Sequence, residues 1–299
     1  MLHSKRFKYS HLLLGILAVS LTTISCKKGD AGDLSDRPVY LKIDDITVSG
    51  NSQVHGEGTD QITDAWVYVD DKQIGVFELP CEVPVLLSGS RNIKVFGGIK
   101  QNGITSQRSQ YIFYSPYSLD TLLTEEETIQ LNPVVAYSST TQVPWKEDFE
   151  DISTLLDSTT NSRVAIVRLK DPSIARTGLY VGAINLTTET PSAQIYTVDK
   201  IDIPKFVESY MEIDYKSNVT VKVLITAYLR TGLVRSVELI NIKASDDIRG
   251  NGWKKMYIFL APILESVPDA VDYRIFIETA LPTGSQSGYV YIDNMKIVH

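Results

Sequence analysis

The sequence predicts an all-β protein made of two β-sandwich domains, and two patterns support this. Short segments in which apolar and polar residues alternate recur along the chain, and Gly, Asn, Asp and Pro separate them. No window keeps a helical period of 3.6 residues for three turns, and the strongest helical candidate is a short segment at 262–267. Many short strands separated by turns are typical of sandwiches and barrels.

The clearest strand lies at 219–228, where one face is apolar and the other mostly polar. Its apolar face holds Val219, Val221, Val223, Ile225 and Ala227, and its other face holds Thr220, Lys222, Leu224, Thr226 and Tyr228. The same alternation recurs in Val271, Tyr273, Ile275 and Ile277. Further strands are expected within 38–48, 64–70, 92–99, 127–137, 163–170, 206–215, 234–243 and 288–298.

The domain boundary is expected where small polar residues interrupt the strands. Residues 138–142 read SSTTQ and are followed by Pro144, between one strand-rich region and the next. We therefore predict one β domain over 37–138 and a second over 139–299.

The first residues predict export. Lys5, Arg6 and Lys8 precede an apolar run at 12–21, which is too short to span a bilayer as a helix. A basic start followed by a short apolar run and small residues describes a secretory signal, here 1–25. The polar, Gly-containing stretch at 26–36 is expected to be a flexible tether.

The end of this signal, Thr23-Ile24-Ser25-Cys26, resembles the lipobox of bacterial lipoproteins, although Thr23 occupies the place where that family usually has Leu. The resemblance implies that Cys26 carries the lipid, such as palmitate, and anchors the chain to a membrane. Lys27, where inner-membrane lipoproteins have Asp, implies the outer membrane, facing either the cell surface or the periplasm. An ordinary cleaved signal with an accidental cysteine is the alternative.

A tight hairpin is predicted in the first domain, where Asp70-Asp71 separates two apolar segments. The unit from Val67 to Phe96 resembles PEGA-type and related immunoglobulin-like modules. Such modules usually act as spacers or surface scaffolds.

The second domain resembles galactose-binding-like jelly rolls, which include many carbohydrate-binding modules. The resemblance rests on three segments: the acidic opening 147–151 (EDFED), the segment 253–258 (WKKMYI) with 273–275 (YRI), and the last strand 291–297 (YIDNMKI). It implies a jelly-roll sandwich and, in many such modules, a structural calcium ion that ties the first strand to the last.

Four acids match that calcium site in place and chemistry, because calcium prefers carboxylate and carbonyl oxygens. They are Glu147, Asp148, Glu150 and Asp293. Solvated carboxylates at strand ends are the alternative. No cofactor is required by the sequence, and calcium is the only metal that it suggests.

Aromatic side chains provide the candidate glycan-binding residues, because their rings combine apolar area with polar tips. The residues predicted to bind glycan are Trp145, Trp253, Tyr289 and Tyr291, with Tyr228 and Tyr257 as further candidates. The alternative for each is a place in the core or at the domain junction.

Composition argues against most enzymes and against nucleic-acid binding. Only His55 and His299 follow the signal, so a packed Ser-His-Asp or Cys-His site is not expected. The formal charge is −7, without a basic stripe for nucleic acid. We therefore expect a non-catalytic, membrane-anchored binding or adhesion module, with glycan or envelope proteins as partners. A structural accessory lipoprotein without a small ligand is the alternative, and a carboxylate-dependent hydrolase is a third.

Overall fold

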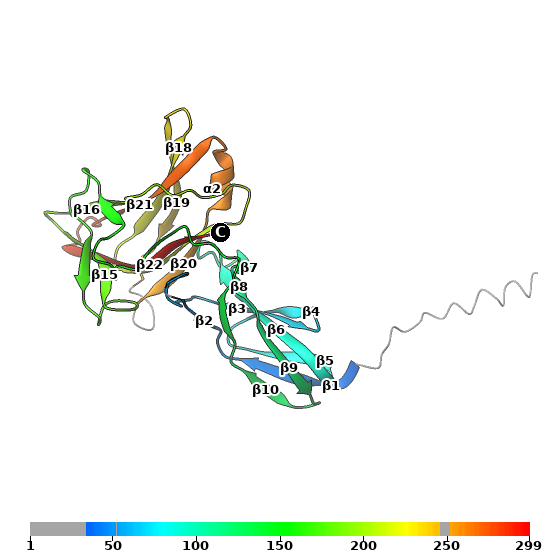
Figure 1. Cartoon of the computed structure of the whole chain (residues 1–299). Helices are drawn as coiled ribbons and strands as arrows, with labels where there is room; N and C mark the ends of the chain where they lie inside the picture. Colours follow the sequence, from blue (N-terminus) through cyan, green and yellow to red (C-terminus); the bar gives the residue numbers. More distant parts are fainter. Residues whose placement is uncertain (1–33, 52, 246–251) are drawn as a thin grey trace, which may run out of the picture.

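The computed structural model describes residues 34–51, 53–245 and 252–299, which form two β-rich halves joined end to end (Figure 1). The predicted signal 1–25 and the predicted lipid-bearing Cys26 lie outside the described residues. Within the described ranges, no helix is long and apolar enough to cross a membrane.

The N-terminal half contains three sheets around one hydrophobic cluster. The largest, here called the hairpin sheet, has the order β4-β3-β6-β7, with β9 also paired to β6. Its strands are β3 (Asp64–Val69), β4 (Lys72–Glu78), β6 (Gly89–Lys100), β7 (Arg108–Gln110) and β9 (Tyr117–Leu123). The two small sheets are β10-β1-β5 (Thr128–Leu131, Leu34–Ile43, Cys81–Leu87) and β2-β11-β8 (Thr47–Ser49, Val134–Tyr137, Tyr114–Ser115).

The second half is a jelly-roll sandwich of two sheets. The first, here called the junction sheet, has the order β14-β15-β22-β17-β20, with β12 paired to β22. The second, here called the open sheet, has the order β13-β16-β21-β18-β19. The junction-sheet strands are β12 (Trp145–Glu147), β14 (Val167–Lys170), β15 (Tyr180–Thr187), β17 (Tyr210–Ser217), β20 (Lys254–Phe259) and β22 (Ser287–Val298). The open-sheet strands are β13 (Leu156–Ser158), β16 (Ser192–Thr197), β18 (Val221–Leu229), β19 (Val234–Ile242) and β21 (Ala270–Ala280).

Strand alternation decides which side chains fill the space between these two sheets. The predicted apolar face of 219–228 is buried, with Val223 fully enclosed and the other four residues at most 3% exposed. The residues between them, from Thr220 to Tyr228, point to the outside of the open sheet, because successive side chains of a strand point to opposite faces. The sequence prediction for this strand is confirmed.

Two local predictions are also confirmed. Asp70 and Asp71 join β3 to β4 with φ of 50° and 61°, the left-handed geometry that a two-residue hairpin turn requires. The short helix predicted at 262–267 is α2 (Ala261–Ser266), with Pro262 in its first turn, where a missing N–H costs nothing.

Two predictions made from the sequence differ from the structure. Val271 was predicted to share the buried face of β21, but it is 41% exposed. The register between β18 and β21 shifts next to it, since Tyr228 pairs with Asp272 and Leu229 with Ala270, and this irregularity turns Val271 outward. The tether was predicted to run to residue 36, but β1 begins at Leu34 and Ser35 is buried.

The two halves share a buried junction instead of meeting through a bare linker. Tyr210, Tyr257 and Val298 of the junction sheet belong to the hydrophobic cluster of the N-terminal half. The segment between the halves is also held: Gln142 exchanges two backbone hydrogen bonds with His299, at 2.9 and 3.1 Å. Strand β11 ends at Tyr137 and β12 begins at Trp145. The domain division at 138/139 and the separate folding of the two parts stay predictions.

Candidate functional site

The second half has two outer sheet faces with different surroundings. On the junction sheet, the outward side chains of β17 and β20, such as Glu212 and Tyr257, face the N-terminal half and are buried. The outward side chains of the open sheet are mostly partly exposed, and a pocket of about 410 Å³ lies among them. The open sheet therefore provides the candidate site.

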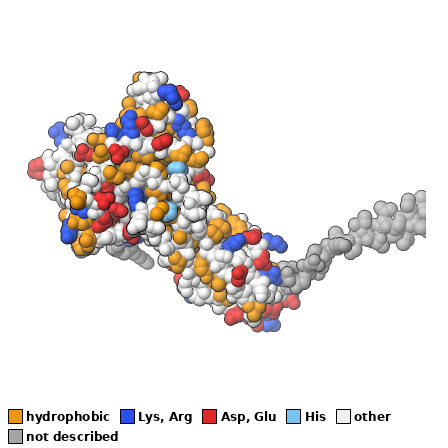
Figure 2. Space-filling view, viewed as in Figure 1, with side chains coloured by type: hydrophobic (Ala, Val, Ile, Leu, Met, Phe, Trp, Pro, Cys, Tyr) orange, Lys and Arg blue, Asp and Glu red, His pale blue; other side chains and the backbone are white. Residues whose placement is uncertain are grey.

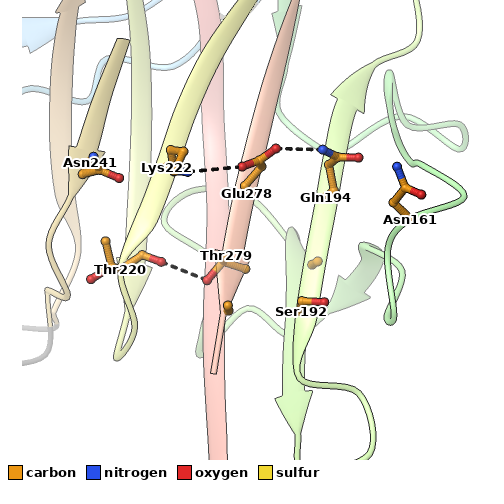
Figure 3. A pocket seen from close by; sticks show the side chains of 10 residues that line it. Asn161, Ser192, Gln194, Thr220, Lys222, Asn241, Glu278 and Thr279 are labelled. Atoms are coloured by element: carbon orange, nitrogen blue, oxygen red, sulfur yellow. Dashed lines mark hydrogen bonds and ion pairs between the residues drawn. The ribbon is translucent and has the colours of Figure 1, made fainter. Parts of the chain in front are cut away.

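A row of polar side chains crosses the open sheet at right angles to its strands (Figure 3). Gln194 of β16, Glu278 of β21 and Lys222 of β18 are direct cross-strand neighbours. Gln194 Nε2 donates to Glu278 Oε1 at 2.7 Å, and Lys222 Nζ lies 3.6 Å from Glu278 Oε2. Asn241 of β19 and Asn161, from the loop after β13, extend the row at its two ends. With strands about 4.8 Å apart, the row from β16 to β19 is about 14 Å long.

An apolar row runs beside the polar one, two residues further along the strands. Tyr196, Phe276 and Leu224 are cross-strand neighbours and are all partly exposed. The rings of Tyr196 and Phe276 stack with their centroids 5.8 Å apart and an interplanar angle of 22°. The open sheet thus presents an apolar aromatic surface next to a line of hydrogen-bonding groups.

Arg274 closes the far side of the apolar row. Its guanidinium lies 5.2 Å from the ring centroid of Tyr196 and 5.8 Å from that of Tyr228. It also donates to the carbonyl of Val198 at 2.7 Å. These contacts fix the cation against the sheet, so it borders the aromatic surface without standing out from it.

The opposite face, on the junction sheet, is built around buried charge. Lys255 Nζ lies 2.8 Å from Glu212 Oε2, and both side chains are fully buried. The hydroxyls of Tyr111 and Tyr137, from the N-terminal half, donate to Glu212 at 2.6 and 2.7 Å. Burial opposes ionisation of Glu212, but Lys255 and Lys296 outweigh it and lower its pKa. This carboxylate is held as an anion inside the junction and is not available to a ligand.

The two tryptophans predicted to bind glycan are buried. Trp145 is 6% exposed and belongs to the core of the second half. Trp253 is 9% exposed, and its indole N–H donates to the carbonyl of Ile174 at 2.9 Å. Neither ring presents a face to solvent, because both pack against protein, so neither is part of the open-sheet site.

The two predicted tyrosines lie together, but on the other sheet. Tyr289 and Tyr291 of β22 are partly exposed and stack with centroids 4.8 Å apart. Of the further candidates, Tyr257 is buried in the junction and Tyr228 lies on the open sheet. The structure therefore places one of the six aromatic candidates at the open-sheet site.

The four acids predicted to bind calcium hold backbone N–H groups instead of converging. Glu147 accepts from the amides of Phe149, at 2.6 Å, and Leu155. Asp148 accepts from the amide of Glu150 at 3.2 Å. These contacts hold the turn that follows β12.

Glu150 and Asp293 both bind the loop that leads into β15. Glu150 accepts from the amides of Leu179 and Tyr180, at 2.7 and 2.8 Å. Asp293 accepts from the amides of Arg176 and Thr177, at 3.0 and 3.2 Å. Burial raises the pKa of Asp293 to about 8. One loop thus links the beginning of the second half to its last strand.

Over the described ranges, no group of three or more His, Cys, Asp or Glu side chains is arranged to hold a metal. Calcium binding by the four acids stays a prediction. Melting the chain with calcium and with a chelator tests it, and an Asp293→Asn variant that keeps the whole calcium response would contradict the role of Asp293.

Sequence reasoning missed Gln194, Glu278 and Asn241 and placed Lys222 only on a polar strand face. The available signal was alternation, which gives the face of each residue but not its neighbour on the next strand. Register between strands distant in sequence brings these residues into one row.

No family model matches the chain. No curated protein matches it either. Among solved structures, it is similar to the CBM22-1 xylan-binding domain of Paenibacillus barcinonensis Xyn10C, with 12% identity and a TM-score of 0.39, covering 54% of this chain and 96% of that one.

Two further structures show a similar level of likeness. The K3 cleaved adhesin domain of Lys-gingipain from Porphyromonas gingivalis has 11% identity and a TM-score of 0.34, covering 53% of this chain and 98% of that one. The tailspike protein 4 of bacteriophage CBA120 has 18% identity and a TM-score of 0.37, covering 50% and 20%. At such low identities and scores, these similarities say nothing about what this chain binds.

Proposed function

We propose that this protein is a non-catalytic glycan-binding module, and that the glycan lies across the outer face of the open sheet. The observation that carries the proposal is the polar row, Asn241–Lys222–Glu278–Gln194–Asn161, beside the apolar row of Tyr196, Phe276 and Leu224. A sugar ring has hydroxyls around its rim and apolar C–H groups on its faces. It therefore matches a surface with hydrogen-bonding groups on one side and aromatic carbon on the other.

The carboxylates of this face support binding over hydrolysis. Lys222 Nζ lies 3.6 Å from Glu278 and 3.9 Å from Glu238, so one cation lies between the two acids and favours the ionised form of both. Hydrolysis of a glycosidic bond by carboxylates requires two acids that flank the bond with different protonation states. Two acids tied to a shared lysine suit a positioning and hydrogen-bonding role instead.

Affinity electrophoresis in gels that contain soluble neutral polysaccharides, with an oligosaccharide array, tests the proposal. We expect Gln194→Ala and Glu278→Gln to weaken binding at least tenfold, because both interrupt the polar row. Glu265→Gln is the matched control, since it removes the same charge from an exposed position on α2. Equal binding by Glu278→Gln and Glu265→Gln would contradict the site.

We also propose that the chain is a lipoprotein of the outer membrane, anchored through Cys26. The support is the short apolar run that ends in Ser25-Cys26. Labelling cells with a fatty-acid analogue should mark the wild type and not Cys26→Ser. An unlabelled wild type would contradict the anchor.

A further inference from the structure

The hairpin sheet of the N-terminal half carries three aromatic side chains on its outer face: Trp66, Tyr68 and Phe96. Trp66 and Phe96 are cross-strand neighbours, and the rings of Tyr68 and Phe96 meet edge to face at 5.3 Å. All three are partly exposed. In the part of the chain that the structure describes, none belongs to the hydrophobic cluster of this half. These three residues are called the Trp66 platform below.

The orientation of Trp66 is unusual for a surface tryptophan. A Cβ added at Gly98 would lie 2.8 Å from its Nε1 and 2.9 Å from its Cδ1, so the pyrrole side of the indole rests on the backbone of β6. Its N–H is buried and has no acceptor among the described residues. A tryptophan at a surface usually turns its N–H toward a polar partner. Here the polar end is turned inward, so the exposed part of the ring is hydrocarbon.

Charged side chains surround the Trp66 platform in compensating pairs. Lys94 Nζ lies 2.6 Å from Asp71, beside Tyr68. On the other side, Arg108 contacts both Asp64 and Glu78, the latter at 3.1 Å, and Lys100 Nζ lies 3.7 Å from Glu78, so two cations face two acids. Opposite charges are therefore paired around the aromatic surface, which favours a ligand without net charge over an anionic one.

The size of the platform separates a sugar from a protein partner. Each aromatic side chain has about 150–250 Å² of surface, so three that are only partly exposed leave on the order of 200 Å². Val76, the cross-strand neighbour of Trp66, is 41% exposed and extends the strip by one strand. A stable protein interface needs about 800 Å² on each partner. The strip crosses three strands, about 10 Å, which is roughly the scale of one or two sugar rings.

We propose that the Trp66 platform is a second glycan-binding site, which stacks against the apolar face of an uncharged sugar ring. It shares its ligand class with the proposed function but rests on different residues in the other half. Two sites on one chain would bind a polymeric glycan more tightly than either site alone, because the second contact forms at a high effective concentration.

The test measures binding of the chain from Lys27 to soluble neutral polysaccharides and to short oligosaccharides cut from them. We expect Trp66→Ala to weaken polymer binding at least tenfold and Trp66→Phe to weaken it less, with little change in melting temperature. The matched control is Leu122→Ala, which removes an apolar side chain that is 63% exposed on the same sheet. The double variant Trp66→Ala/Glu278→Gln should lose polymer binding.

The outcomes separate this proposal from the proposed function. Trp66→Ala that binds like the wild type, while Glu278→Gln does not, overturns the platform and leaves the open-sheet site standing. The reverse result supports the platform and overturns the open-sheet site. If sedimentation shows that wild-type chains self-associate and that Trp66→Ala abolishes only this association, the platform is a protein contact and the proposal fails.

Discussion

Two lysine–glutamate pairs lie on the two outer faces of the same sandwich, and their environments differ completely. Lys255 and Glu212 on the junction sheet are 2.8 Å apart with both side chains fully buried. Lys222 and Glu278 on the open sheet are 3.6 Å apart with side chains 39% and 31% exposed. The residue types are the same, so burial alone makes the first pair structural and leaves the second free to meet a ligand.

The junction face also uses its tyrosines differently from the open face. Tyr111 and Tyr137 donate to Glu212, and burial raises their pKa well above the usual range, so they stay protonated donors. On the open face, Tyr196 stacks on Phe276 and stays partly exposed. On the face seen in Figure 2, both acidic and basic side chains lie over each of the two halves.

The largest effect is expected when the junction is removed altogether. Fragment 139–299 would expose Tyr210 and Tyr257, which are 1% and 2% exposed in the full chain. It would also expose the buried pair of Glu212 and Lys255. Losing the burial of the two rings alone costs roughly 3–6 kcal/mol. We therefore expect the fragment to melt well below the full chain in circular dichroism. A fragment that melts at the same temperature would mean that the junction contributes little to the stability of the second half.

Breaking the buried pair should have the next largest effect. Lys255→Met leaves Glu212 buried without its cation, which costs about 3–5 kcal/mol. Urea unfolding of the full chain measures this. The double variant Lys255→Met/Glu212→Leu should recover part of the loss, because it removes the unpaired carboxylate, although it leaves the hydroxyls of Tyr111 and Tyr137 without that acceptor. If the double variant is no more stable than the single one, the loss comes from packing and not from the buried, unpaired carboxylate.

Lys296 should give the junction a pH dependence. Burial lowers its pKa to about 8, with Lys255 and Lys146 adding to the effect and Glu212 and Asp214 opposing it. The unfolded chain binds this proton more tightly than the folded chain, since its pKa there is 10.5. Above pH 10.5 Lys296 is neutral in both states and causes no loss of stability. As the pH falls from 10.5 to about 8, the free energy of unfolding decreases, and below about pH 8 the contribution of Lys296 no longer changes.

The corresponding measurement is the free energy of unfolding at pH 7.5 and at pH 10. The wild type should gain about 2 kcal/mol relative to Lys296→Met over this interval. If the free energies of unfolding of the wild type and of Lys296→Met change by the same amount with pH, Lys296 has the same pKa in the folded and unfolded states.

The smallest effect on stability is expected on the open face. Lys222→Met should change the free energy of unfolding by less than about 1 kcal/mol, because exposed ion pairs are worth little. It should nevertheless weaken glycan binding, since it removes the centre of the polar row. A loss of stability as large as that of Lys255→Met would erase the distinction between the two faces.

The amino-acid sequence by itself determined the strands and their faces. Alternation gave the buried face of 219–228, and Asp70-Asp71 gave the hairpin, because both depend on neighbouring residues alone. The prediction of Val271 failed for the same reason, since the irregularity beside it arises from pairing with β18.

Only the tertiary structure decided which polar side chains form a site. Glu212 and Glu278 occupy similar alternating positions in similar strands, yet one is sealed under the N-terminal half and the other borders a pocket. The aromatic candidates divided in the same way, with Trp145 in the core and Tyr228 on the open sheet. Contacts between segments far apart in the chain set these outcomes. A strand's own residues specify its two faces, but not what covers each of them.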